Sequence, residues 1–144
     1  MQQLIPTLFQ RISTQMPSLA LIDEDYGQLD FTNSGDSYPV TFPCVLLGNL
    51  EADWQHISPS EQKGLATITA KLAIDCYDDT HLGSGTEHRI AQRADLANQL
   101  YMALQAFCPL PRQMTPLDRI KTQYYPLPGG IKVYQHIFTF RIQQ

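Results

Sequence analysis

Long apolar runs and a secretion signal are missing from this chain. No hydrophobic stretch approaches the roughly 20 residues that a helix needs to cross a bilayer. The first residues, MQQLIPTLFQRISTQ, lack the charged start, the continuous apolar centre and the small-residue cleavage site of a signal peptide. We therefore expect neither a membrane partner nor export.

Cysteine is scarce as well. Cys44, Cys76 and Cys108 are an odd number of thiols in apolar surroundings. This pattern is typical of a reducing cytosol and not of a secreted domain held by disulfides. Thiols in such positions are normally packing groups, so we expect none of them to act as a nucleophile.

Basic residues are too few for a phosphate-binding face. The chain has 10 Lys and Arg against 14 Asp and Glu, a net charge of −4 and a pI near 5.4. This balance argues against duplex nucleic acid as the main partner. With 144 residues, of which 43% are hydrophobic, the chain is predicted to form one soluble α+β domain over residues 1–144.

The loop that most resembles a catalytic or nucleotide site lacks the residues that such sites require. In DCYDDTHLGSGTEHR (75–89) acids, a histidine and two glycines precede a helix, but no lysine follows Gly83 and Gly85, and no third glycine completes a dinucleotide fingerprint. The letters SGTE instead match a capping box. Ser84 is expected to accept from the amide three residues on, and Glu87 from the amide of Ser84.

A divalent metal is the alternative interpretation of this loop. Carboxylate and imidazole groups do bind such ions, but the spacings of known zinc and calcium motifs are absent. No G-x-S-x-G elbow is present either. We therefore predict no enzyme, no catalytic residue, no cofactor and no metal site. The candidate ligands of the alternative are Asp75, Asp78, Asp79, His81, Glu87 and His88.

What is present is a pattern of helices and strands. Apolar periodicity predicts a short helix at 2–15 and a long helix at 90–108, the second ended by Pro109. A short continuous apolar run predicts a strand at 44–47 that is covered on both faces. Alternation predicts a strand at 66–77, and aromatic and β-branched residues around a Pro-Gly turn predict a hairpin at 117–142. A small hairpin is expected at 19–31, and exposed loops at 33–37 and 51–63. The fold class is thus α+β: a mainly antiparallel sheet, one long helix packed across it and a short N-terminal helix.

The terminal hairpin carries apolar residues on both faces, so something besides the long helix is expected to cover it, either the first helix or a neighbouring subunit. Trp54, in the predicted loop, is expected either to fold back on the core or to anchor a partner. The possible interface residues are Trp54, Ile131, Val133, Tyr134, His136 and Phe138.

The order of elements, together with the pieces YGQLD, YPVTFPCVLL and YPLPGGIKVYQHIFTFRI, resembles small phage or prophage tail-completion proteins, which include tail terminators. The resemblance implies a ring, commonly of six subunits, that ends the tail tube and meets the head or neck. It implies partners that are copies of the chain itself, tail-tube proteins and head or neck proteins, and it supplies no catalytic residues. The expected location is the bacterial cytoplasm before assembly and the virion tail afterwards.

Two other functions remain open from the sequence. One is a non-catalytic binding or adaptor domain of a bacterial mobile element. The other is a small metal-dependent hydrolase, which requires a metal in the 75–88 loop.

Overall fold

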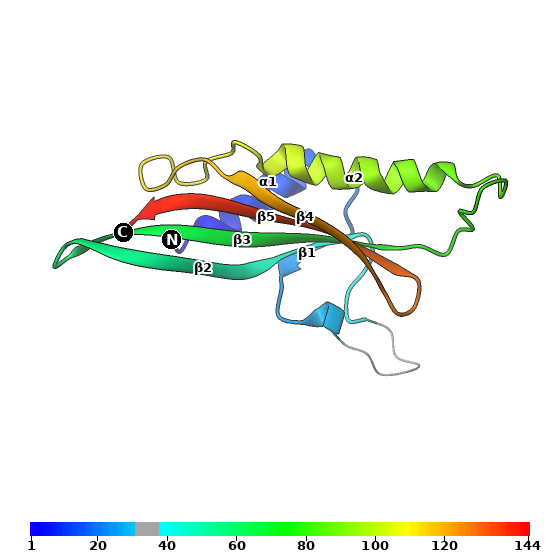
Figure 1. Ribbon diagram of the computed structural model, residues 1–144, viewed down its shortest axis with the longest axis horizontal. Coiled ribbons are helices and arrows are strands. Elements are labelled where there is room, and N and C mark those ends of the chain that lie inside the picture. Colours follow the sequence, from blue (N-terminus) through cyan, green and yellow to red (C-terminus); the bar gives the residue numbers. More distant parts are fainter. Residues whose placement is uncertain (31–37) are drawn as a thin grey trace.

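The computed structural model describes residues 1–30 and 38–144, which form a five-stranded sheet with both helices on one side of it (Figure 1). The strand order is β1-β2-β3-β5-β4, and every pairing is antiparallel except that of β1 with β2. The predicted α+β class is confirmed. The elements are α1 (Leu4–Gln15), β1 (Leu21–Glu24), the short 3-10 helix η1 (Gln28–Asp30), β2 (Cys44–Ser58), β3 (Glu61–Asp75), α2 (His88–Leu104), β4 (Asp118–Leu127) and β5 (Ile131–Gln143).

The main core lies between the helices and one face of the sheet, which we call the helix face. Helix α1 buries Leu4, Leu8 and Ile12, one residue per turn, because a four-residue step keeps side chains on one side of a helix. On strand β3 every second residue from 66 to 74 is apolar and buried on this face, as predicted, and these residues include Ile68 and Leu72. The opposite side of the sheet, which carries the odd-numbered residues of β3, is called the open face.

A second, smaller cluster explains why the terminal hairpin is apolar on both faces. Ile131 and Val133 of β5 pack on the open face with buried residues that include Cys44 and Leu46. Partly buried side chains of the segment 38–42, including Phe42, close this cluster. At this end of β5 the chain therefore covers its own second face, and the predicted cover by α1 or by a neighbouring subunit is wrong here.

The predicted hairpin at 19–31 is also wrong. Strand β1 pairs in parallel with the start of β2, and residues 28–30 form η1 rather than a returning strand. The buried side chain of Gln28 stabilises this turn, because its amide nitrogen donates to the carbonyl of Glu24 while its oxygen accepts from the amide of Tyr26. Phe31 and the predicted loop at 33–37 lie outside the described residues.

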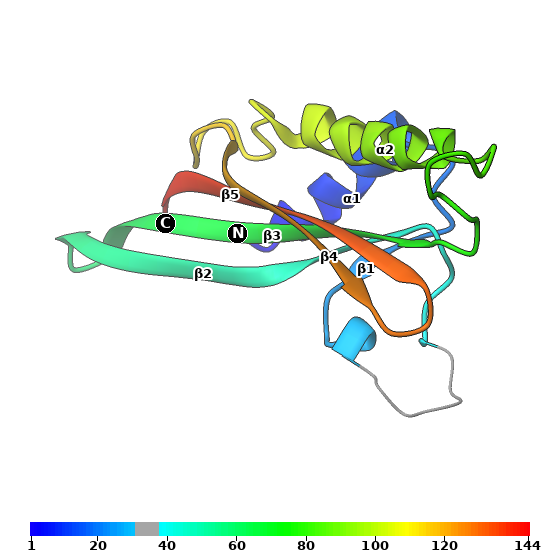
Figure 2. The ribbon, with the colours of Figure 1, turned by 45° about the vertical axis from the view of Figure 1, so that its right-hand side comes forward.

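The segment 51–63 is a β-hairpin, not the predicted loop. Strands β2 and β3 pair as far as Ser58 and Glu61, so that only Pro59 and Ser60 form the turn. The turn end of this hairpin extends past the helices in both views (Figures 1 and 2), and residues 49–65 are called the arm. Its polar composition misled the prediction, because apart from Ala52 it adds no side chain to either core cluster and apolar residues are not required there.

The long helix is shorter than predicted. It ends at Leu104, and Ala106 adopts a left-handed conformation with φ of 63°. The amide of Ala106 donates to the carbonyl of Leu117, and the amide of Leu117 donates to the carbonyl of Phe107. These bonds draw the chain out of the helix before Pro109 is reached. Ile90, expected on the buried stripe, is exposed.

A free-edged sheet as the candidate functional site

The 75–88 loop starts helix α2, as predicted, but through different hydrogen bonds from those of a capping box. The Glu87 carboxylate accepts from the amides of Gly83 (3.1 Å) and Gly85 (3.3 Å) and from the Ser84 hydroxyl (3.2 Å). Ser84 Oγ accepts from the amide of Thr86, not from that of Glu87. Slight desolvation alone would raise the pKa of Glu87, but these donors outweigh it and the pKa is lowered.

The candidate metal ligands in this loop do not converge. His81 Nδ1 lies 2.7 Å from Asp79 Oδ1 with both side chains largely exposed, and Arg89 lies 3.4 Å from Asp78. Over residues 1–30 and 38–144 no group of three or more His, Cys, Asp or Glu side chains is placed to hold a metal ion. In the same ranges no helix is both long and apolar enough to cross a membrane.

The cysteines pack in the interior or donate weak hydrogen bonds. Cys44 is fully buried, and burial raises its pKa to about 11, so its thiol stays protonated near neutral pH. Cys76 Sγ donates to the carbonyl of Ile74, and Cys108 Sγ donates to the carbonyl of Met114. None of these positions is that of an activated nucleophile.

His136, one of the predicted interface residues, joins three elements inside the molecule. Its Nε2 lies 2.9 Å from the carbonyl of Ala97 in α2, and its Nδ1 lies 3.2 Å from Thr122 Oγ1 in β4. Because a carbonyl only accepts, Nε2 carries the proton and Nδ1 is the acceptor. Burial lowers the pKa of His136, and the nearby Arg119 guanidinium lowers it further, so the ring is neutral.

The other predicted interface residues of β5 are buried within the chain. Ile131, Val133, Tyr134 and Phe138 expose at most 4% of their surface. They belong to the two core clusters and present no surface to a partner. Trp54 differs, since it lies on the arm and is 37% exposed.

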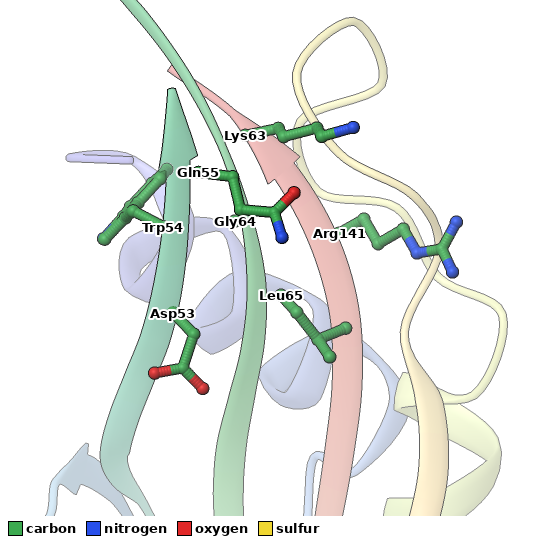
Figure 3. Close-up of a pocket in the computed structure, with 7 residues that line it drawn as sticks. All are labelled: Asp53, Trp54, Gln55, Lys63, Gly64, Leu65 and Arg141. Atoms are coloured by element: carbon green, nitrogen blue, oxygen red, sulfur yellow. The ribbon is translucent and has the colours of Figure 1, made fainter. Parts of the chain in front are cut away.

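Trp54 packs across the arm on Gly64, its partner in the strand register. A Cβ atom at Gly64 would lie 2.9 Å from the Trp54 ring, so only glycine leaves room for this packing. On the other side of the arm, the open face, lies a hollow of about 540 Å³ (Figure 3). Its lining residues are Asp53, Trp54, Gln55, Lys63, Gly64, Leu65 and Arg141.

The outer edge of β2 is free along the arm. Strand β1 covers only Cys44–Leu47 of this fifteen-residue strand. It leaves at Gly48, where an added Cβ would lie 2.7 Å from Asp25 Cβ, and the left-handed Asn49 (φ 54°) begins a bulge. Among the described residues no strand pairs with the outside of β2 beyond this point.

Strand β4 is the opposite edge, and it too is unpaired on its outer side within the part of the chain that the structure describes. At its start the Arg119 guanidinium lies 3.7 Å from the Tyr101 ring centroid, and the Arg119 amide donates to Gln105. Farther along, Ile120 and Tyr124 are 57% and 50% exposed. Long edges with exposed apolar side chains are unusual in monomers, because they invite pairing with another chain.

Sequence reasoning did not find these edges, since it interpreted residues 51–63 as a loop. The signal was present in the alternation of Leu50, Ala52 and Trp54 with Glu51 and Asp53. A two-residue turn within SPSE completes the pattern of a hairpin. Among the described residues, the arrangement as a whole is an α+β fold whose sheet has two open edges.

Comparison with known proteins supports this architecture. No protein-family model matches the chain, and no curated protein matches it. One similar solved chain belongs to a structure described as the virion of a native gene transfer agent particle. The TM-score is 0.57 at 10% sequence identity, and the match covers 98% of this chain and 95% of that one. At this identity the likeness concerns the fold, which the two chains share over nearly their whole lengths.

Proposed function

We propose that this chain is a structural protein of a phage-like particle, with a tail-completion role like that of tail terminators. The observation that carries the proposal is the likeness over almost the whole of both chains to a chain from a gene transfer agent virion. The free edges of β2 and β4 support assembly by protein–protein contacts.

A closed ring is the assembly that suits such a subunit. If each copy offers one edge to the edge of the next, all edges are covered and growth stops when the ring closes. We infer a ring at the end of the tail tube, with tail-tube and head or neck proteins as partners. In this role the chain is not an enzyme, it stays in the host cytoplasm until assembly, and it then belongs to the virion tail.

The location of the chain in particles tests this proposal. Particles purified from cells that produce the chain with an epitope tag should carry the tag at one end of the tail in immunogold electron micrographs. Cells that lack the gene should give tails of irregular length or tails that are not joined to heads. Particles that assemble normally without the chain, and that never carry the tag, would contradict the proposal.

An adaptor domain of a mobile element is the second candidate. The hollow on the open face of the arm favours it, since a recess lined by an exposed leucine and by side chains of both charges suits the binding of a peptide. In this case tagged protein is recovered bound to a protein that is absent from particles.

A further inference from the structure

We propose that the free edge of β2 in one copy pairs with the outer edge of β4 in a second copy, head to tail. This inference rests on the proposed function for its biological setting, because it names the surfaces through which a ring closes. The pairing itself depends only on the two edges of this sheet. The occupant of each edge is a second copy of the chain.

The first argument is the pattern of exposed apolar side chains. Leu50, Trp54 and Ile57 are exposed on the arm, and Ile120 and Tyr124 are exposed on β4. A strand added to an edge gains main-chain hydrogen bonds together with side-chain contacts on both faces. Both edges therefore hold what an added strand requires, namely unpaired backbone groups and partly exposed apolar side chains.

The second argument is charge on the open face. Asp53 lies opposite Leu65, and Glu51 lies opposite Thr67, which places both acids on this face. Lys121 lies opposite Ile137, which in turn lies opposite Thr69, so Lys121 is on the open face too. On the open face the β2 edge thus carries two acids, and the β4 edge carries Lys121 along its length with Asp118 at its first residue.

Within the part of the chain that the structure describes, these charged side chains form no ion pair. The ion pairs among the described residues are those of Lys71 with Asp25, His81 with Asp79 and Arg89 with Asp78. Glu51, Asp53 and Lys121 take part in none of them. Opposite charges on two edges favour the contact of β2 with β4, whereas two β2 edges would bring acids together.

The third argument is the arrangement of aromatic side chains on the helix face. Trp54 pairs in register with Gly64, and Tyr124 pairs with Tyr134, whose ring it contacts edge-on at 4.5 Å between centroids. Both exposed aromatics therefore lie on the helix face. Antiparallel pairing of β2 with β4 keeps the two helix faces on one side, so that the exposed aromatic residues of both edges lie on that side and the charged residues lie on the open face.

Charge reversal tests the pairing. Asp53→Lys and Lys121→Glu should each raise the dissociation constant of self-association at least tenfold, which corresponds to about 1.4 kcal/mol. The reason is that like charges then face each other across the contact. Sedimentation velocity measures the association. An equimolar mixture of the two variants should restore association, because in a head-to-tail array every contact then pairs Lys with Glu or Asp with Lys. Asp95→Lys and Lys132→Glu make the same changes of charge at exposed sites outside the two edges and should leave association unchanged.

Trp54 gives an independent readout, because it is the only tryptophan in the chain. Its emission should shift to shorter wavelength as the native chain associates, and circular dichroism shows whether each variant is folded. The pairing is overturned if the native chain stays monomeric at its highest soluble concentration, if both variants associate like the native chain, or if their mixture is no better than either alone. The labelling of particles tests the proposed function separately. If tails carry the tag but the charge-reversal variants associate like the native chain, the proposed function is retained and only the pairing of β2 with β4 is rejected.

Discussion

His136 is the residue at which protonation and folding are most directly connected. Its neutral ring donates to α2 and accepts from β4 or Arg119, and a second proton on Nδ1 would face the Arg119 guanidinium and remove the acceptor for Thr122. The aromatic neighbours of His136 are Phe138 and Tyr101, and the Arg119 guanidinium overlies the Tyr101 ring. This environment favours the neutral form.

The free energy of unfolding should therefore fall with acidification through this residue. The folded-state pKa of His136 lies below its unfolded value of about 6.5, so the contribution of the neutral ring is fully present above that value. It is lost as pH falls from about 6.5 towards the folded-state pKa, by up to about 1.4 kcal/mol per pH unit. Urea unfolding at pH 7.5 and at pH 5.5 measures this change.

His136→Gln should show a smaller difference between these two pH values than the native chain, whereas His81→Gln, at an exposed histidine, should keep the native difference. An equal pH dependence in the native chain and in His136→Gln would contradict the assignment.

At the scale of elements, the two halves of the β2–β3 hairpin differ in what they contribute to stability. The half next to the helices holds core residues such as Ile68 and Leu72, and it pairs with β5, where Phe138 is completely buried. On the arm, by contrast, Leu65 is 55% exposed. Removal of a buried aromatic leaves a cavity, while removal of an exposed leucine side chain loses little contact.

Phe138→Ala should lower the free energy of unfolding by about 3–5 kcal/mol, and Leu65→Ala should change it by less than about 0.5 kcal/mol. Urea unfolding monitored by circular dichroism gives both values. A loss of less than about 1 kcal/mol for Phe138→Ala would show that the core relaxes around the gap.

The prediction from sequence succeeded where one face of an element is buried against a helix. Strand β3 keeps a period of two because its helix face packs on α1 and α2, and α1 shows its four-residue step for the same reason. The prediction failed for the arm, because the turn end of the arm extends beyond both helices and neither face of the arm has to be apolar. Its pairing depends on contacts between segments, which composition does not encode.

The candidate site was predicted only in part, for a related reason. Trp54 was selected as a large aromatic residue in a polar segment, and it is partly exposed on the arm. Ile131 and Val133 were selected because both faces of the terminal hairpin are apolar, but residues far away in sequence, at 29 and 38–46, cover them. Such long-range cover does not leave a local pattern in the sequence.

At the scale of the whole molecule, the arm is separable from the core. Residues 54–64 contribute no member to either cluster of buried apolar residues, and Asp53 lies opposite Leu65, where a shorter turn can join the strands. Two-residue Asn-Gly turns suit such a junction. The fold and the proposed assembly surface can therefore be tested apart.

Replacement of residues 54–64 by Asn-Gly should leave the circular dichroism spectrum and the midpoint of thermal unfolding nearly unchanged, since the core is intact. Self-association should be lost, because the outer part of the free β2 edge, with Trp54 and Ile57, has been removed. Sedimentation velocity measures the association, and Asp95→Lys in the full-length chain serves as the control for a surface change. A truncated chain that associates like the native one would place the contact elsewhere.

The early departure of β1 from the sheet has a consequence for spacing between subunits. Strand β1 occupies the β2 edge as far as Leu47 and is held nearby by the ion pair of Asp25 with Lys71, at 2.9 Å. A neighbouring strand that slides along β2 towards the core must collide with the end of β1. This collision limits how far a neighbour can slide, and a neighbour that rests against β1 takes the same offset at every contact, which a closed ring of identical contacts requires.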